Sequence, residues 1–359
     1  MTAQVIDFPT RYVLDQQGDI PELESDWPLF IDWLTIRQVH EGGGLPRVSD
    51  GWMTSTDADG AIQYELVKRS EIEGSFDSRS FLRCDGSVIE FHGNVARYGR
   101  RDNVFGYTWP ETIRRVNDLL NLHSLPPFTA GRLLRYADTG WHYTGARVSR
   151  IDVTMNYAAF SERDAQAVLL KLGQHHRGRQ TGTVMPDQST VTFGYGSKYA
   201  SGKVYLKHVE LEKHRRTKHG AHVDGEVIEF CRRVGMLREE LTLKSRFLTQ
   251  NGLCFLAQIT TEELMRVYRA RSQIGRFKEM EISDTAHLSA AAMGTLARWE
   301  RGEPHGLKRA TFYRHRREIL GALGIDISVA RSVVEFKQPV KVVEVQALVA
   351  PDWYRRKYG

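Results

Sequence analysis

The sequence predicts an α+β protein: a largely antiparallel sheet with flanking helices, followed by a C-terminal region that is mainly helical. Three observations predict this fold class. Segments with the two-residue periodicity of strands recur from residue 30 to about 247. Helical segments separate some of them, but regular strand–helix–strand repeats do not occur. After residue 260 the pattern becomes mainly helical, and an apolar content of 41% in 359 residues is enough for a large core.

The first third of the chain is expected to supply strands and one helix. Phe30–Ile36 has the composition of a strand and precedes a glycine run at 42–44. Further strands are predicted around 63–67, 80–83 and 88–92. Residues 107–122 have the pattern of a helix, because Pro110 suits a first turn and a stripe of apolar residues follows it.

The middle of the chain contains the clearest alternation, at Val148–Asn156. A helix capped by Ser161 is expected to follow and to end near residue 175. Segments 190–195 and 203–211 are predicted to pair as a hairpin, 227–234 to form a short helix, and 237–247 to form another alternating strand.

One face of this predicted sheet is polar. Asp152, Glu240 and Tyr205 lie on the polar sides of their strands, and Lys207 shares the face of Tyr205. A phenol with a pKa near ~10 is only about 0.1% ionised at pH 7, so a neighbouring cation is needed to activate it as a nucleophile. We therefore expect the functional site here; the alternative is a strand tyrosine beside a solvated lysine.

The C-terminal region is predicted to contain three helices, at 261–269, 289–300 and 307–323. The third helix is basic and follows a short turn, which is the outline of a helix-turn-helix DNA reader. A basic amphipathic helix on the protein surface is the alternative. A last strand-like run, 333–348, leads to a tail at 351–359 that we expect to be exposed.

Charge divides the chain further. The net charge of +6 and the pI near 9.1 favour a polyanionic partner only mildly, but segments 203–218 and 266–317 are strongly basic and suit phosphate contacts. We expect an acidic N-terminal arm at 1–27, a catalytic α+β domain at 28–258, a helical DNA-binding region at 259–330, and a strand with a basic tail at 331–359.

Other features argue against secretion and membrane insertion. No run approaches the ~18 apolar residues of a membrane span, and the N-terminus lacks the pattern of a secretion signal. Cys84, Cys231 and Cys254 are too few and too far apart for a disulfide framework or a zinc site, and they suit a reducing cytoplasm.

Six strings stand out in order along the chain: Phe30-Ile-Asp-Trp-Leu34, Asn103-Val-Phe-Gly106, Val148-Ser-Arg-Ile-Asp152, Tyr205-Leu-Lys-His-Val-Glu-Leu211, Leu237-Arg-Glu-Glu-Leu241 with Lys244-Ser-Arg-Phe-Leu248, and Pro351-Asp-Trp-Tyr354. Together they resemble the gene II family of filamentous-phage replication initiation proteins, which are rolling-circle nicking-joining enzymes. The string that begins at Tyr205 is the most specific, and the similarity is strongest from about 85 to 260. There are two departures. A spacer, 94–102, separates His92-Gly93 from Asn103, and the family's Arg-Phe-Glu appears here as Arg238-Glu239-Glu240.

The resemblance implies that Tyr205 attacks one origin phosphodiester, becomes joined to the 5′-phosphate and releases a 3′-hydroxyl primer, and that the displaced strand is later rejoined. Mg²⁺ or Mn²⁺ would stabilise the anionic transition state. Asp152 and Glu240 are the first candidates as metal ligands. Asp152 could instead pair with Arg150 or Arg238, and Glu240 with Lys244 or Arg238. Glu210 reaches the site only if the strand bulges or becomes helical after Lys207, and Glu239 points to the other face.

Charge and strand phase indicate further roles. Lys207 is expected to lower the pKa of the tyrosine or to clamp the phosphate. His208 is a candidate ligand or general acid, and His92 a candidate ligand. The residues predicted to contact DNA are Lys203, Arg215, Arg216, Lys244, Arg246, Lys308, Arg309, Arg314, Arg316 and Arg317.

The implied partners are double-stranded and single-stranded phage origin DNA, with the replicative helicase and polymerase of a bacterial host, in the host cytoplasm and without a membrane. Oligomerisation on the origin is left open. Two other functions compete: an origin-binding protein or transcriptional regulator that never cuts, and a tyrosine recombinase, which uses arginine and histidine clamps in place of a metal.

Overall fold

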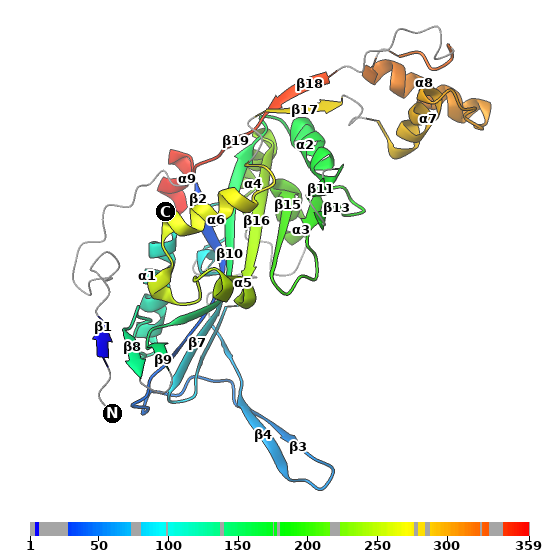
Figure 1. Ribbon diagram of the computed structural model, residues 1–359. Coiled ribbons are helices and arrows are strands. Elements are labelled where there is room, and N and C mark those ends of the chain that lie inside the picture. Colours follow the sequence, from blue (N-terminus) through cyan, green and yellow to red (C-terminus); the bar gives the residue numbers. More distant parts are fainter. Residues whose placement is uncertain are drawn as a thin grey trace.

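The computed structural model describes residues 4–6, 28–72, 80–97, 100–136, 140–174, 176–177, 180–215, 223–275, 279–283, 288–323, 325–329 and 340–358. The strand pairs within these ranges are antiparallel, and the chain is α+β as predicted (Figure 1). Apart from residues 4–6, the acidic arm lies outside the described residues.

A ten-stranded sheet forms the centre, in the order β13-β14-β15-β16-β10-β2-β7-β6-β5, with β19 paired to β10. Its long strands match the predicted alternating segments. The bounds are β2 Leu29–Val39, β5 Ser70–Glu71, β6 Phe81–Cys84, β7 Val88–Gly93, β10 Arg147–Ala158, β13 Thr183–Val184, β14 Thr190–Phe193, β15 Ala200–Leu206, β16 Met236–Lys244 and β19 Gln346–Ala347.

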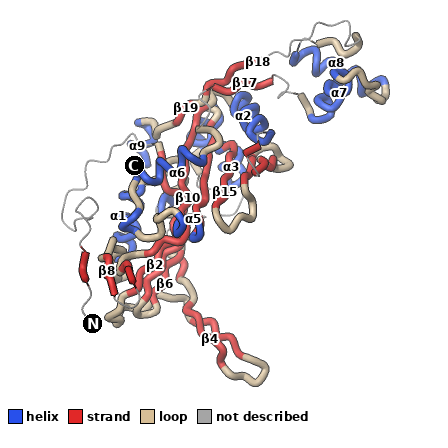
Figure 2. Tube along the Cα trace, viewed as in Figure 1, coloured by secondary structure: helices blue, strands red, loops and turns tan. Residues whose placement is uncertain are grey.

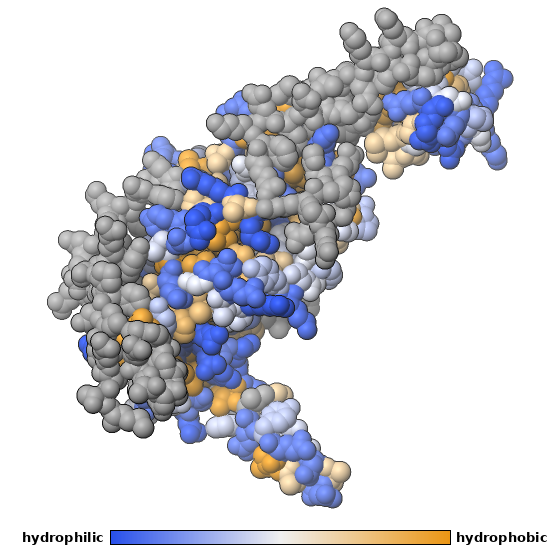
Figure 3. Space-filling view, in the orientation of Figure 1, coloured by the Kyte–Doolittle hydropathy of each residue, from blue (hydrophilic) through white to orange (hydrophobic). Residues whose placement is uncertain are grey.

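Smaller pieces of sheet accompany it. A projecting hairpin, β3 with β4, extends beyond the end of the large sheet (Figure 2). It exposes large apolar side chains, including Trp52 and Ile62, and apolar colour is visible on it in Figure 3. The bounds are β1 Gln4–Ile6, β3 Trp52–Thr56, β4 Ile62–Val67, β8 Leu133–Tyr136, β9 Gly140–Tyr143, β11 His176–Arg177, β12 Gln180–Thr181, β17 Glu279–Ser283 and β18 Val340–Glu344.

The helices begin close to the predicted positions where a cap is present. Ser161 accepts a hydrogen bond from the amide of Asp164 (3.0 Å) just before α2. Ser289 does the same for the amide of Ala292 before α7 (3.2 Å). The bounds are α1 Trp109–Leu122, α2 Glu162–Gln174, α3 Lys207–Arg215, α4 Gly225–Arg233, α5 Ser245–Gln250, α6 Thr261–Arg271, α7 Ala290–Glu300, α8 Arg309–Leu323 and α9 Asp352–Tyr358.

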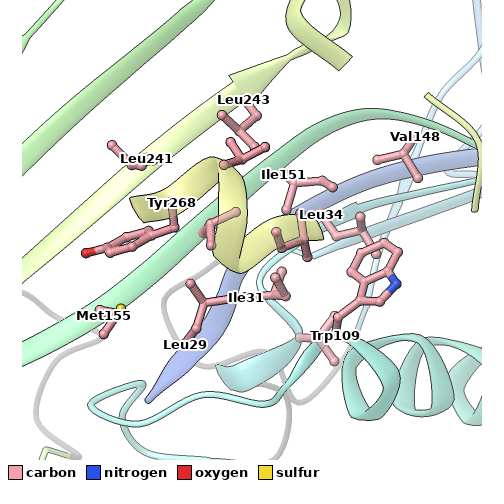
Figure 4. Close-up of a cluster of buried hydrophobic side chains, with 14 of the residues drawn as sticks. Leu29, Ile31, Leu34, Trp109, Val148, Ile151, Met155, Leu241, Leu243 and Tyr268 are labelled. Carbon is pink, nitrogen blue, oxygen red and sulfur yellow. The ribbon is translucent and has the colours of Figure 1, made fainter. Parts of the chain in front are cut away.

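The largest core lies on one face of the sheet. Apolar residues of β2, β10 and β16 pack there against α1, α2, α5 and α6. Figure 4 shows Ile31, Ile151 and Leu243 from three neighbouring strands in this core, with Trp109 of α1 and Tyr268 of α6 close to them. The other face of the sheet therefore keeps the polar residues.

Two more cores are separate from the first. The cluster of α3, α4 and α9 includes Leu211, Ile228, Met236 and Tyr354. The cluster of α7 and α8 is built on Leu296, Trp299, Ile319 and their neighbours, and in Figure 1 it stands apart from the sheet, beyond the β17–β18 ribbon.

Two predicted strands end earlier than expected. The strand that carries Tyr205 stops at Leu206, and α3 begins at Lys207. The ion pair Lys207–Glu210 and the contact of Glu210 with His214, three and four residues apart, favour the helix. The strand predicted to reach residue 247 stops at Lys244, because Phe247 and Leu248 enter the core from α5.

The C-terminal tail also differs from its prediction. Residues 352–358 form α9, and Tyr354 is only 2% exposed.

The connection between α7 and α8 runs over residues 301–308, longer than the roughly 3–4 residues of a helix-turn-helix turn. Of the strand predicted at 333–348, the described part consists of β18 and β19.

Two global observations complete the fold. The three cysteines are buried and form no disulfide. Within the described part of the chain, no helix has the length and apolar character needed to cross a membrane.

Candidate active site

The polar face of the sheet is shaped by a bulge in β2. Asp152 of β10 is opposite Trp33, whereas the next residue, Val153, is opposite Ile31, so Asp32 is the extra residue. Ile31 and Leu34 on either side remain in the core. The bulge therefore keeps Asp32 out of the core without disturbing the apolar pattern around it.

Tyr205 is hydrogen-bonded at this face. It lies near the end of β15, and its hydroxyl donates to Oε1 of Glu240 on the neighbouring strand β16. The ammonium of Lys203 is 2.8 Å from Oε2 of the same carboxylate and 4.9 Å from the centre of the tyrosine ring. The predicted nucleophile and the predicted carboxylate are therefore in direct contact.

The acidity of Tyr205 is determined mainly by its burial. Burial raises the pKa of the phenol well above 10, and the charge of Glu240 adds to this rise, whereas Arg238 opposes it. The expectation that Lys207 lowers this pKa or clamps the phosphate stays a prediction. The phenol is protonated at neutral pH, with a carboxylate in place to accept its proton.

The chain changes from strand to helix at Lys207, the first residue of α3. Glu210 was expected to reach the site only if such a change occurred. The ammonium of Lys207 donates to Oε2 of Glu210 (2.7 Å) and to Oδ1 of Asn103 (3.0 Å). Burial lowers the pKa of Lys207, and nearby Arg238 lowers it further. Burial alone would raise the pKa of Glu210, but Lys207 and His214 hold it well below its ordinary value.

Asp32, which the sequence analysis did not select, is held by two amides and one arginine. Its Oδ1 accepts from Nδ2 of Asn103 (2.7 Å) and from Nδ2 of Asn94 (3.1 Å), and it is 3.9 Å from Nη1 of Arg238. Burial raises the pKa of Asp32, and the charge of Glu240 raises it further. Asn94 belongs to the 94–102 spacer, so this spacer supplies a contact to the site. The sequence did contain a signal for this residue, because Asp32 is the one acidic residue in the otherwise apolar string 30–34.

Asp152 makes the alternative contact that the sequence analysis considered. Nε and Nη2 of Arg150 donate to its two oxygens at 2.9 and 2.6 Å, and the guanidinium lies 5.0 Å from the centre of the Trp33 ring. Burial raises the pKa of Asp152 to about 6, although Arg150 opposes the rise. Glu240 and Asp32 contribute to it, which shows that the three carboxylates influence one another electrostatically.

Two neighbouring candidates turn out to lie elsewhere. His208 is 2% exposed, and its Nε2 is 3.0 Å from Glu162 of α2, so its predicted role as ligand or acid at Tyr205 has no support in the geometry. Nδ1 of His92 is 2.9 Å from the hydroxyl of Thr35, and its ring meets the edge of Trp33 at 4.9 Å.

Glu239 occupies the opposite face, as predicted. It accepts from the hydroxyls of Ser272 (2.5 Å) and Tyr268 (3.0 Å) and from two backbone amides, those of Gln273 (2.5 Å) and Ile274 (3.3 Å). It therefore ties α6 and the following turn to the sheet and takes no part in the site.

The residues can be compared with what a divalent cation requires. Among the described residues, no group of three or more His, Cys, Asp or Glu side chains is arranged to hold a metal. Glu240, Glu210 and Asp152 each contact a basic side chain at 3.0 Å or less, whereas Asp32 lies 3.9 Å from Arg238. Asp32 is thus the carboxylate least engaged with a cation, and an oxygen donor of this kind is what a hard cation requires.

The predicted DNA contacts fall into three groups. Lys203 and Lys244 are engaged within the protein, with Glu240 and with the carbonyl of Ser197. Arg316 forms a double hydrogen bond with Asp326, at 2.6 and 2.5 Å. Arg216 lies outside the described residues. The other predicted contacts are exposed, and Lys203 is exposed as well, in spite of its contact with Glu240. The others are Arg215, Arg246, Lys308, Arg309, Arg314 and Arg317.

The fold and the site define the class: an α+β protein with a buried tyrosine–carboxylate pair beside cations on one face of an antiparallel sheet. The chain belongs to the gene II family of replication-associated proteins, because the model of the N-terminal part of that family matches residues 30–262. Residues 283–358 match the model of the C-terminal part of the same family. The resemblance predicted from the sequence is confirmed.

Relatives extend over most of the chain. The replication-associated gene II protein of Enterobacteria phage I2-2 is 26% identical over 342 residues, covering 88% of this chain and 92% of the relative. The protein of the same name from Escherichia phage If1 is 24% identical over 314 residues, covering 76% and 95%. A looser likeness, with a TM-score of 0.25 and 13% identity over 63% of this chain and 78% of the other, is to the rolling circle replication initiator protein from Geobacillus stearothermophilus.

Proposed function

We propose that the protein initiates rolling-circle replication of phage DNA by nicking one strand at the origin, with Tyr205 as the nucleophile. The observation that carries the proposal is the hydrogen bond from the Tyr205 hydroxyl to Glu240, with Lys203 in contact with the same carboxylate. A buried phenol is a weak nucleophile, and a carboxylate in contact with it is the group that can remove its proton.

The reaction would proceed by in-line phosphoryl transfer. The Tyr205 oxygen attacks the phosphorus and its proton passes to Glu240. The bond from phosphorus to the 3′-oxygen breaks, which leaves a 5′-phosphotyrosine and a 3′-hydroxyl primer. Lys207, a buried ammonium with a lowered pKa, is suited to protonate the departing oxygen. Rejoining is the reverse: a 3′-hydroxyl attacks the phosphotyrosine, and because the link conserves the bond energy, ATP is not required.

Mg²⁺ or Mn²⁺ is part of the proposal. Asp32 is the candidate ligand least engaged with a cation, and Glu240 and Asp152 would join it only by leaving Lys203 and Arg150. Bound there, the ion would neutralise charge on the phosphoryl oxygens. Glu210, bonded to Lys207, is better suited to orienting that lysine than to binding metal.

DNA would be bound in two places. Phosphates near the nick would meet the cations around Tyr205, and duplex origin DNA would contact the exposed cations of α8, namely Arg309, Arg314 and Arg317. We infer that the host replicative helicase and polymerase act on the nicked product, in the cytoplasm of the bacterial host.

The direct test is incubation with Mg²⁺ and supercoiled phage-origin DNA, followed by a denaturing gel. The protein is expected to nick the circle and to remain bonded to the 5′ end. Tyr205→Phe should remove both products and leave origin binding intact. Tyr195→Phe is the matched control, because Tyr195 is 89% exposed in the turn before β15 and should be dispensable. Origin binding without nicking by the unchanged protein would sink the catalytic proposal and leave a regulator.

Chelation distinguishes the proposed enzyme from a recombinase. EDTA is expected to abolish nicking, and added Mg²⁺ or Mn²⁺ to restore it. Cleavage that is indifferent to EDTA would favour the metal-free clamp of a tyrosine recombinase.

A further inference from the structure

Asn103 connects two charged groups of the site. Its side-chain nitrogen donates to Asp32 (2.7 Å), and its side-chain oxygen accepts from Lys207 (3.0 Å). An amide has one donor end and one acceptor end, so only this orientation satisfies both neighbours. The position of Asn103 therefore determines where the Lys207 ammonium and the Asp32 carboxylate lie relative to Tyr205.

The segment around Asn103 is held from two sides. On the sheet side, Nη2 of Arg238 donates to the carbonyl of Asn103 (2.7 Å), and Nδ2 of Asn156 donates to the carbonyl of Val104 (2.6 Å). On the other side, Asp102 accepts a hydrogen bond from the hydroxyl of Tyr354, far away at the end of the chain.

Tyr354 is well placed to hold Asp102. It is 2% exposed, its hydroxyl also accepts from Nη2 of Arg100 (3.0 Å), and its ring meets the edge of Phe105 at 5.0 Å. Oδ1 of Asp102 also accepts from the backbone amide of Val104 (2.9 Å), whereas Oδ2 is buried without a hydrogen-bond partner among the described residues. Tyr354 therefore holds this carboxylate from outside its own segment.

Helix α9, which carries Tyr354, is itself fixed to the catalytic sheet domain. Lys357 and the hydroxyl of Tyr358 both bond Asp224 at the start of α4, at 2.6 and 3.0 Å, and Trp353 packs on Phe230 at 5.3 Å. The segment that matches the C-terminal part of the family, residues 283–358, therefore ends in a helix that packs on the segment that matches the N-terminal part, residues 30–262.

We propose that Tyr354 is a positioning residue for strand cleavage: through Asp102 it holds Asn103, and Asn103 holds Asp32 and Lys207 in place. The C-terminal helix is then part of the nicking centre, although the chain runs through α7 and α8 before reaching it. This inference rests on the proposed function, since it assigns Asp32 and Lys207 to the reaction.

The test uses the full-length protein and Tyr354→Phe, which keeps the ring in its pocket and removes only the hydroxyl. We expect kcat for origin nicking to fall about tenfold, the effect of losing one buried hydrogen bond at a positioned group. KM for origin DNA should be unchanged, because no DNA contact is altered. Tyr358→Phe is the matched control: it removes another hydroxyl from α9 that bonds Asp224, and it should leave kcat as it was.

A double mutant tests whether Tyr354 acts through Asn103. If it does, Asn103→Ala combined with Tyr354→Phe should be no slower than Asn103→Ala alone. Losses of kcat that multiply, an unchanged kcat in Tyr354→Phe, or an equal loss in Tyr358→Phe would each overturn the positioning role.

Hydrogen exchange separates this inference from the proposed function. Amides of residues 102–106 should exchange faster in Tyr354→Phe than in the unchanged protein or in Tyr358→Phe. If the unchanged protein fails to nick DNA, the proposed function fails, and equal exchange in all three proteins would overturn the contact itself.

Discussion

The two charged regions of this protein are built in opposite ways. Around Tyr205 the charged side chains are mostly buried, with Lys203 as an exposed exception, and carboxylates contact cations, as in Glu240 with Lys203 and Glu210 with Lys207. On α8 the cations Arg309, Arg314 and Arg317 are exposed to solvent. Burial makes the first region sensitive to position, whereas exposure leaves the second tolerant and screened by salt.

This contrast indicates a division of work. Buried, paired charges suit chemistry, because small displacements change their interaction strongly. Exposed cations suit affinity for a polyanion, because counterions are released when phosphates replace them. Substitutions in the two regions should therefore change different quantities, kcat in the first and Kd with its salt dependence in the second.

The largest effect is expected from Glu240→Gln. The amide cannot take the Tyr205 proton, and it leaves Lys203 without its partner, so kcat for nicking should fall by about 10²–10⁴-fold. Origin affinity should change little. The measurement is single-turnover nicking with saturating DNA.

Glu239→Gln is the matched control for that experiment. The neighbouring carboxylate faces the core and anchors Tyr268 and Ser272, so its loss should lower the free energy of unfolding by roughly 1–3 kcal/mol without changing kcat. Equal kcat losses in both variants would break the distinction between the two faces of the sheet.

An intermediate effect is expected on α8. Replacing Arg309 and Arg314 by Ala should weaken origin binding roughly tenfold at 0.15 M salt and reduce the slope of log Kobs against log[salt] by about 2. Cleavage at saturating DNA should be unaffected. Arg316→Ala, which removes a side chain already tied to Asp326, should alter the slope less. A kcat defect in the double variant would show that α8 contributes to chemistry.

The smallest effect concerns pH and stability. The pKa of Asp152 is raised from 3.8 to about 6 in the folded state, so between these values the folded protein binds more protons than the unfolded chain. Stability attributable to Asp152 is therefore greatest below about pH 4 and is lost as pH rises through about 6.

Denaturant unfolding at pH 5 and pH 7 measures this dependence. Asp152→Asn should flatten it, removing roughly 1–2 kcal/mol of the difference between the two pH values. An unchanged pH dependence would mean that Arg150 keeps Asp152 ionised throughout. Burial would then have little effect on the pKa of this carboxylate, and the contrast between the buried region and α8 would be weaker.

Much of this arrangement could be predicted because strand periodicity is local. Alternation alone assigned Asp152, Glu240 and Tyr205 to the polar side and Glu239 to the core, since side chains in a strand point alternately to the two faces. The limits of this reasoning appear where periodicity breaks. The bulge that brings in Asp32 and the helix that starts at Lys207 both depend on neighbouring strands and on charge pairs within the fold.

The sequence by itself determined the α+β class, the long strands of the central sheet, the family and the tyrosine with its carboxylate, because each depends on local pattern or on a contiguous motif. Only the tertiary structure decided that Asn103 joins Asp32 to Lys207, that the phenol is buried and protonated, and that Tyr354 reaches Asp102. These contacts join residues up to 252 positions apart. They depend on burial and on the packing of distant segments, which periodicity along the chain does not encode.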